Sequence, residues 1–163
     1  EFKDGVKHGL WQTLNLIGDP IMIGHFKDGK KHGKFEQWYD DGAYRHRELI
    51  ATFDEDRYVE DYKEWYENGA KSIMGFYIDG KEDGKYTEWY ENGNPKIEIT
   101  TKNGYIIVMK KYFENGNIQT ITNRKDGKLH GKSVVYDMDG NIIYQTNFDN
   151  GIEGKPVNES ISS

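Results

Sequence analysis

The sequence is short of several residue types, and each shortage excludes a class of protein. It has no cysteine, which rules out disulfide bonds and thiolate chemistry but leaves the cell compartment open. Proline contributes only 3 residues, whereas glycine contributes 19 and aromatic residues make up 14%. Disordered linkers are rich in proline as well as glycine and poor in aromatic residues, so this composition argues against disorder. No apolar run approaches the length that spans a membrane.

Hydrophobic residues are also scarce. They make up only 35% of the 163 residues, which is too few to fill a thick aliphatic core. The 12 tyrosines and 4 tryptophans are large rings whose polar tips can reach water while the ring lines a thin layer. We therefore expect one domain with a thin interior that is rich in aromatic side chains.

Basic residues are outnumbered by acidic ones. The 22 Lys and Arg stand against 28 Asp and Glu, which gives a formal net charge of −6. Nucleic acids and anionic lipids select basic surfaces, so we expect neither as the main partner. The segment "KDGKKHGK" at Lys27–Lys34 is a candidate for a local basic patch, with a solvated loop as the alternative.

Glycines that follow Asp or Asn recur at a fixed spacing, in two phases. The step within each phase is 23 or 24 residues, except for one step of 27 across Thr52–Tyr58. A fixed period of this length is typical of an array of small supersecondary units. The first phase has Gly5, Gly29, Gly80, Gly104, Gly127 and Gly151, with Asp56 in the missing slot; the second has Gly18, Gly42, Gly69, Gly93, Gly116 and Gly140. We expect one array of about six repeats over residues 1–155, and a terminal loop over residues 156–163.

The turn residues predict that each repeat is a β-hairpin. Asn-Gly or Asp-Gly between two alternating runs is the strongest short hairpin signal, so Lys34–Asp40 and Ala43–Ala51 are predicted as paired strands. The other turn, as in "KDGKKHG", carries a second glycine four residues on, which suits a change of strand direction. We expect an all-β fold: an elongated, twisted, single-layer antiparallel sheet of about twelve strands in tandem hairpins. Thr52–Tyr58 is predicted to be an enlarged loop.

Two aromatic columns precede the second-phase glycines. Neighbouring strand residues face opposite ways, so we expect the columns on opposite faces, with the end repeats as polar caps. The tryptophan column, four residues before the glycine, comprises Trp38, Trp65, Trp89, Tyr112 and Tyr136, with Leu14 in the first repeat. The tyrosine stripe, one residue later, comprises Tyr39, Tyr66, Tyr90 and Phe113. A further column seven residues before the glycine holds Phe35, Tyr62, Tyr86 and Met109.

One column must be structural, because the sheet otherwise has no core. We take the tryptophan column as structural, and the tyrosine stripe as a binding surface about 30 Å long. Exposed contiguous aromatic surface of this kind marks interaction sites. The alternative is that twist packs both columns within the sheet.

The repeats resemble a known family. The segments "DGKKHGKFEQWYDDG", "DGKEDGKYTEWYENG" and "DGKLHGKSVVYDMDG" are similar to the bacterial variant of the MORN repeat, and the resemblance covers Phe2–Gly154. Two units depart from it: Asp54–Gly69 lacks the first glycine pair, and Asn103–Gly116 lacks the glycine four residues on. The resemblance implies a hairpin sheet without shared catalytic residues. It also implies an antitoxin-like role in bacteria, or a scaffold or membrane-proximal platform as in eukaryotic relatives.

Catalytic and metal sites find little support in the residue pattern. His8, His32 and His130 share one slot, but adjacent repeats would hold them roughly 9–10 Å apart, too far to share a zinc ion. We interpret them as turn residues. An acidic column could place carboxylates at the separation of inverting glycosidases, yet it lies beside turns with nothing to raise a pKa. We expect no enzyme activity, no cofactor and no metal.

Three functions remain to be compared. The first is a protein-interaction module, antitoxin-like by resemblance, that docks a partner on its aromatic face while acidic rims steer a basic partner. The second is an exported envelope module that binds glycan or a cell-wall ligand on stacked aromatics. The third, a lipid-surface platform, is disfavoured by the negative charge. Open edge strands also allow edge-to-edge homo-oligomers.

The chain begins at Glu1, and Phe2 stands where Phe26 stands one repeat later. We therefore expect that the sequence starts inside a longer protein, with an unknown number of repeats upstream. Localisation follows from the missing part: cytoplasmic for an antitoxin-like protein, or exported if a signal peptide precedes it.

Overall fold

The computed structural model describes residues 1–40 and 46–154, and every regular element in them is a β-strand. The all-β prediction is therefore confirmed. The chain divides into two units, Glu1–Glu82 and Asp83–Ser163, which we describe separately as unit 1 and unit 2. The hairpin glycine Gly42, the first residues of the predicted strand Ala43–Ala51 and the predicted tail at 156–163 lie outside the described residues.

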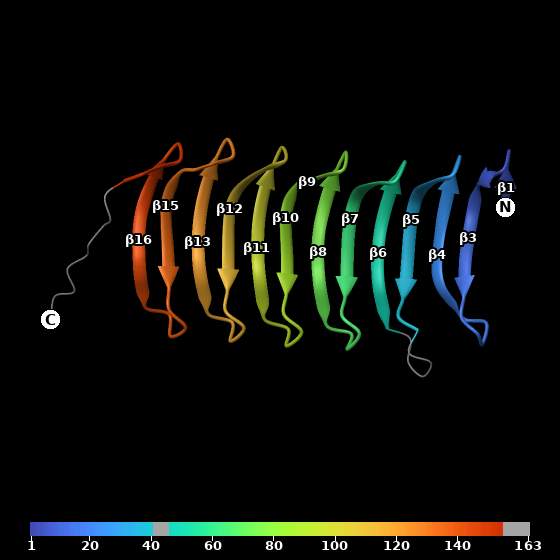
Figure 1. The fold of residues 1–163 in the computed structure, drawn as a ribbon, viewed down its shortest axis with the longest axis horizontal. Coiled ribbons are helices and arrows are strands. Elements are labelled where there is room, and N and C mark those ends of the chain that lie inside the picture. The colour runs from blue at the N-terminus through green and yellow to red at the C-terminus, as the bar shows by residue number, and fades with distance from the viewer. Residues whose placement is uncertain (41–45, 155–163) are drawn as a thin grey trace. The chain divides into compact units, whose positions relative to one another are not determined.

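Unit 1 is a single antiparallel layer in which strands follow one another in chain order (Figure 1). The ribbon of β1 and β2 pairs by itself, β3 to β8 pair in succession, and β9 pairs with β8. The strands are β1 (Phe2–Lys3), β2 (Val6–Lys7), β3 (Gly9–Leu14), β4 (Pro20–Lys27), β5 (Lys30–Trp38), β6 (Arg47–Asp54), β7 (Arg57–Trp65), β8 (Lys71–Ile78) and β9 (Lys81–Glu82).

Unit 2 repeats this plan. Its main strands pair with their neighbours in chain order, β14 pairs with β13, and β17 pairs with β16 (Figure 1). The strands are β10 (Gly84–Trp89), β11 (Pro95–Lys102), β12 (Tyr105–Tyr112), β13 (Ile118–Lys125), β14 (Lys128–Leu129), β15 (Gly131–Tyr136), β16 (Ile142–Asp149) and β17 (Ile152–Glu153). Each unit is thus a row of hairpins, as the period predicts.

The first-phase Asx-Gly pairs form two-residue turns. In the turn that joins β4 to β5, Lys27 pairs with Lys30, and the residues between them have φ values of 50° and 84°. Two successive positive φ values define the tight hairpin turn whose twist matches that of the strands. These turns are hairpin turns in their own right, so both glycine phases mark hairpins.

The enlarged loop predicted at Thr52–Tyr58 is wrong. β6 and β7 are joined there by the same two-residue turn, with Asp54 paired to Arg57 across it. The extra residues of this repeat lie on the other side of β6: eight residues separate the paired Trp38 and Arg47, whereas five separate Trp65 and Lys71. The spacing between glycines showed that this repeat has three extra residues, but it did not show which of its two turns contains them.

The second glycine of the "KDGKKHG" pattern is a bulge residue. Between the pairs Gly24–Phe35 and Phe26–Lys31 the register of β4 and β5 shifts by two residues, and Gly33 in this stretch has a φ of 76°. The β11–β12 pairing shifts by only one residue, because Gly104 and Gly116 are 12 residues apart where Gly80 and Gly93 are 13 apart. That repeat lacks both the glycine and the extra bulge residue, which removes the need for a positive φ. In the β6–β7 pair the two-residue shift is kept, and Glu60 takes the glycine slot with a φ of 62°.

The core of unit 1 is a row of directly paired residues in which large rings alternate with small residues. The row runs Trp11, Gly24, Phe35, Ala51, Tyr62, Gly75, one residue per strand from β3 to β8. Phe35 is 2% exposed and Ala51 is fully buried. A Cβ atom on Gly24 would lie 2.3 Å from the Phe35 ring, so this ring occupies the space above the glycine backbone. The face of the sheet that carries this row is called the core face below.

The corresponding row of unit 2 has smaller and more polar residues. Tyr86, Ile99, Met109 and Thr122 pair in succession across β10 to β13, and Ser133 pairs with Thr146 across β15 and β16. Ser133 and Thr146 are among the buried residues of the unit. The same hairpin scaffold therefore carries an aromatic row in one unit and a largely aliphatic and hydroxyl-bearing row in the other.

Candidate functional site

The core face of unit 1 carries a continuous chain of touching aromatic rings, which we call the aromatic ladder. Successive ring centroids lie 4.7–6.1 Å apart, mostly in edge-to-face geometry. Aromatic pairs favour this arrangement because the positive edge of one ring meets the negative face of the next. The ladder comprises Phe2, Trp11, Phe26, Phe35, Phe53, Tyr58, Tyr62 and Tyr77.

Two lysines lie over the first steps of the ladder. The Lys7 amino group is 4.8 Å from the Trp11 ring centroid and 4.9 Å from that of Phe26. One repeat later, the Lys31 amino group is 5.4 Å from the centroid of Phe35 and 4.7 Å from that of Phe53. A cation over an aromatic face is attracted by the ring quadrupole. Each lysine therefore joins a ring four residues later in the chain, Trp11 or Phe35, to a ring of the next strand, Phe26 or Phe53.

Tyr58 takes the lysine position in the third step. It pairs with Phe53 as Lys31 pairs with Phe26, and its ring touches Tyr62 on its own strand and Tyr77 on the next. Tyr62 and Tyr77 are themselves 5.8 Å apart, so the three rings form one cluster. All three side chains are half-buried, which leaves part of each ring open to solvent.

Two carboxylates accompany this tyrosine cluster. The Tyr62 hydroxyl donates to Glu64, and the Tyr77 hydroxyl donates to Glu82 at 3.5 Å. Burial raises the pKa of Tyr62 well above its usual value, and the Glu64 carboxylate raises it further. Burial, together with the Glu82 charge, also raises the pKa of Tyr77 to about 12. Both phenols therefore stay protonated at neutral pH, beside two acidic groups.

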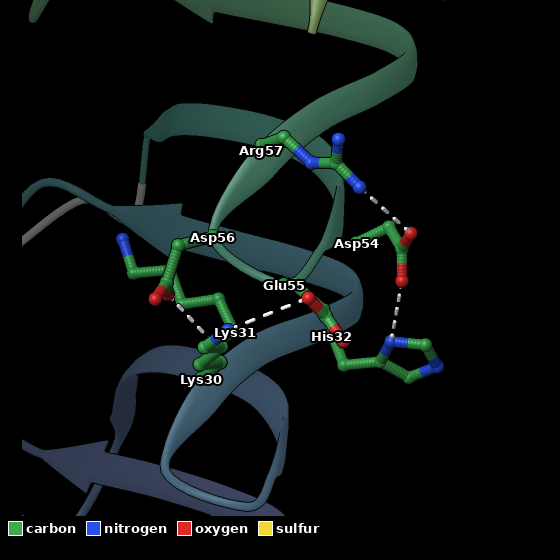
Figure 2. Close-up of polar contacts among 7 residues, drawn as sticks. All are labelled: Lys30, Lys31, His32, Asp54, Glu55, Asp56 and Arg57. Carbon is green, nitrogen blue, oxygen red and sulfur yellow. Dashed lines mark hydrogen bonds and ion pairs between the residues drawn. The ribbon is translucent and has the colours of Figure 1, made fainter. Parts of the chain in front are cut away.

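Contacts between neighbouring turns hold Lys31 in place, as Figure 2 shows. The Lys31 N–H donates to the Asp56 carboxylate at 2.8 Å, and the Asp56 N–H donates to the Lys31 carbonyl at 3.1 Å. Asp56 has a φ of 67° in the slot where the other repeats have glycine. The bond that its side chain makes to Lys31 helps to offset the strain of that conformation. Lys30 with Glu55, at 3.4 Å, extends the contacts between the two turns.

The histidine column makes a related contact in three repeats. Each Nδ1 lies close to the carboxylate of an aspartate at or beside the following tight turn. The distances are 3.6 Å for His8 and Asp28, 3.2 Å for His32 and Asp54, and 3.5 Å for His130 and Asp149. The histidines are thus connected to turns, as the sequence predicts. Within the described residues, no group of three or more metal-ligating side chains is placed to hold an ion.

The predicted tyrosine stripe lies beside the second-phase turns, and its members are half-buried. The Tyr39 hydroxyl donates to the Trp65 carbonyl at 2.8 Å, and the Tyr90 hydroxyl donates to the Tyr112 carbonyl at 3.0 Å. Burial raises the pKa of Tyr39, and the nearby Glu48, Glu67 and Glu64 add to the shift. These hydroxyls tie one hairpin to the next within a unit, a structural role that the sequence analysis missed. Their part in binding stays a prediction.

The predicted tryptophan column is also half-buried. By strand alternation Trp38 lies on the face opposite Phe35, and Trp65 on the face opposite Tyr62. In unit 2 the Tyr112 hydroxyl donates to Glu98 at 2.9 Å on that opposite face. Burial, with this bond, raises the pKa of Tyr112 to about 12. Burial alone would raise the pKa of Glu98, but hydrogen bonds from Tyr112 and Lys85 outweigh it and lower the pKa.

Asparagines make a further tie between turns in unit 2. The side chains of Asn92 and Asn94 both donate to the Glu114 carbonyl, at 2.9 Å each. In the next repeat Asn115 and Asn117 both donate to the Met138 carbonyl, at 3.1 and 2.7 Å. The recurring "NGN" therefore supplies both the turn and its bond to the neighbouring hairpin.

The aromatic ladder itself was not predicted as a site, although a signal for part of it was present. The column seven residues before the second-phase glycines includes Phe35 and Tyr62, two central rings of the ladder. The remaining rings, such as Phe53 and Tyr77, come from the neighbouring strands, and the register between Phe53 and the Tyr62 strand is shifted by two residues. Sequence spacing alone did not show that the two sets meet.

Comparison with known families finds three tandem segments that match the MORN repeat variant, at residues 82–103, 107–126 and 129–150. Comparison with curated proteins finds no match. MORN repeats generally form non-catalytic binding modules, so the matched segments indicate a repeat module for binding. Unit 1 adds an aromatic cluster to this module. In the part of the chain that the structure describes, no helix has the length and apolarity needed to cross a membrane.

Proposed function

We propose that the protein is a non-catalytic interaction module that binds a partner protein along the aromatic ladder of unit 1. The observation that carries this proposal is a chain of eight touching rings on one face of a single-layer sheet. Among the described residues of unit 1, no helix packs on this face, and the two-stranded β1–β2 sheet meets it at one end through Phe2 and Lys7. Phe2 is 68% exposed, and Phe26, Tyr58, Tyr62 and Tyr77 are half-buried. Phe35 and Phe53 in the middle of the ladder are buried, at 2% and 5% exposure, so a partner would meet the outer rings. Clustered, partly exposed aromatic rings favour protein partners, because aromatic side chains dominate interface energetics.

Charge supports a basic partner. Residues 1–82 contain 12 Lys and Arg against 17 Asp and Glu, a net charge of −5, whereas residues 83–163 contain 10 against 11, a net charge of −1. An acidic surface accelerates encounter with a basic partner and disfavours acidic ones. The antitoxin-like role implied by the resemblance fits this picture: the module would dock on a basic protein and occlude its working surface.

The tyrosine stripe is a second candidate surface. Tyr39, Tyr66, Tyr90 and Phe113 keep part of their rings accessible, since all four side chains are half-buried. The variant Tyr66→Ala tests the stripe, because loss of partner binding in a folded Tyr66→Ala protein would assign the surface to it. Unchanged binding in that variant would leave the ladder as the candidate.

The experiment is affinity capture from a native lysate with matched variants. Tyr77→Ser alters the ladder, and Tyr105→Ser alters an exposed tyrosine of unit 2 as the control. Thermal unfolding checks that both variants are folded. We expect the parent chain and the Tyr105→Ser variant to capture the same protein from the lysate. The Tyr77→Ser variant should fail to capture it. Retention on peptidoglycan without any protein partner would contradict the proposal and favour the envelope module.

A further inference from the structure

We propose that the tyrosine cluster of Tyr58, Tyr62 and Tyr77, with Glu64 and Glu82, is a recognition site for a lysine or arginine side chain of the partner protein. This inference rests on the proposed function, since it names the group that the partner inserts into the ladder. Aromatic faces beside carboxylates attract organic cations through the ring quadrupole and through charge.

The ladder contains its own template for this site. In its first two steps a lysine amino group lies over the ring four residues later in the chain and over a ring of the next strand. The third step keeps the two rings, Tyr62 and Tyr77, but has Tyr58 in the lysine position. In the described residues, the amino groups that lie over ladder rings are those of Lys7 and Lys31. The third step therefore has the rings of a cation site and no cation of its own.

The charges change in the same step. The residue two positions after the central ring is Thr13 in the first step and Gln37 in the second, both neutral, and it is Glu64 in the third. Glu82 pairs with Tyr77 where Lys31 pairs with Phe26 two repeats earlier and Tyr58 pairs with Phe53 one repeat earlier. The loss of a resident cation is thus accompanied by the gain of two carboxylates.

Neighbouring basic residues are engaged away from the cluster. The Lys63 amino group pairs with Asp61 at 2.8 Å, and the Arg57 guanidinium pairs with Asp54 at 3.6 Å. Lys63 is one residue from Tyr62 on a strand and so points to the opposite face. The carboxylates of Glu64 and Glu82 accept hydrogen bonds from tyrosine hydroxyls, which fixes their position. Because a neutral hydroxyl does not cancel the negative charge, both carboxylates can still attract a cation of the partner.

The test uses the full chain and a defined probe. The probe is an acetylated, amidated peptide of Gly-Ser spacers with interspersed lysines, compared with the same peptide carrying norleucine in place of lysine, and with choline. Tyrosine ring resonances are followed by NMR and assigned by single Tyr→Phe changes. We expect the lysine peptide to shift the rings of Tyr58, Tyr62 and Tyr77, and the norleucine peptide to leave them unchanged. A choline shift as large as the peptide shift would identify a free quaternary ammonium as the ligand and overturn the proposal.

Variants separate the site from general acidity. Tyr58→Lys places a resident amino group over Tyr62 and Tyr77, so it should abolish binding of the lysine peptide, whereas Tyr58→Phe should bind it as the parent does. Glu64→Gln with Glu82→Gln should weaken binding about tenfold. The matched control is Glu88→Gln in unit 2, where Tyr86 donates to Glu88 at 2.8 Å without the three-ring cluster, and binding should not change. Full binding by a folded Tyr58→Lys protein would overturn the site.

The outcomes distinguish this inference from the proposed function. If Tyr77→Ser loses its captured protein but the lysine and norleucine peptides behave alike, the ladder is an interaction surface and the cation site is refuted. If the lysine peptide binds as expected but Tyr77→Ser retains every captured protein, the cation site stands and the docking surface is refuted.

Discussion

Unit 1 and unit 2 share one scaffold but fill its core face differently. Both are rows of hairpins with two-residue Asx-Gly turns at one end and tied tyrosine-bearing turns at the other. In unit 1 the central row alternates rings with Gly or Ala, and in unit 2 the same row runs through Ile99, Met109 and Thr122. The comparison shows that turn chemistry and bulges set the hairpin array, whereas the central row sets the surface that the array presents.

Close packing explains why the aromatic row needs small partners. A ring as large as Phe35 covers the neighbouring strand only because Gly24 and Ala51 leave room beside it. The row of unit 2 lacks this alternation of rings with Gly or Ala: it begins with Tyr86 and continues through aliphatic and hydroxyl-bearing side chains. The family match, at residues 82–103, 107–126 and 129–150, includes none of the rings of the aromatic ladder.

The largest expected difference between the units concerns stability. Phe35→Ala should lower the free energy of unfolding by about 3–4 kcal/mol, because it removes the most buried ring of the ladder. Met109→Ala, at the equivalent position of unit 2, should cost only about 1–2 kcal/mol because the side chain is half-buried. Urea unfolding measures both. Equal losses would show that the two rows contribute alike and would break the comparison.

The next effect tests the ring and glycine alternation. Gly24→Ala should destabilise the protein by about 1–3 kcal/mol, since the new methyl group would lie 2.3 Å from the Phe35 ring. In a Phe35→Leu background the same change should cost clearly less, because the smaller side chain leaves space. A Gly24→Ala cost that is the same in both backgrounds would mean that the close approach is not the cause.

A smaller effect should be alike in the two units. Tyr39→Phe in unit 1 and Tyr90→Phe in unit 2 each remove one hydroxyl bond to a backbone carbonyl, so each should cost about 1 kcal/mol. Thermal and urea unfolding give the values. A loss in only one unit would show that the turn ties, which we treat as common to both, differ between them.

The smallest effect concerns alkaline pH. A folded-state pKa raised above the unfolded value contributes stability that is complete below pH 10 and is lost as the pH rises through the folded pKa. For Tyr77 in unit 1 and Tyr112 in unit 2 that pKa is about 12, so melting temperatures should fall between pH 10 and 12. Tyr77→Phe and Tyr112→Phe should each flatten this fall. Ionisation of all tyrosines near pH 10, followed by absorbance, would contradict it.

Much of the fold could be predicted from the sequence, because turn residues report it directly. The Asx-Gly period located both sets of hairpins and the absence of helical periodicity excluded a mixed fold. The enlarged loop at Thr52–Tyr58 was wrong because the extra residues of the 27-residue step were assigned to this turn, whereas they lie between Trp38 and Arg47. Asp56 adopts the positive φ that the tight turn requires and bonds to Lys31.

The site was harder to predict, because it depends on register. The pair Trp65–Tyr66 attracts attention as a local motif. The ladder, however, joins Phe26 to Phe35, and Phe53 to Tyr58, across strand pairs whose register shifts by two residues. A shift of one residue in these bulges would send Phe53 to the other face. The replacement of lysine by Tyr58 becomes visible only when the repeats are superposed in that register.

Hydrogen exchange of the chain, alone and with its captured partner, tests the central claim that the aromatic ladder of unit 1 is the interaction surface. We predict that the partner slows exchange in β4 to β8, where the ladder lies, and leaves β12 to β16 unchanged. Protection confined to β10 to β17, with β4 to β8 unaffected, would contradict the account.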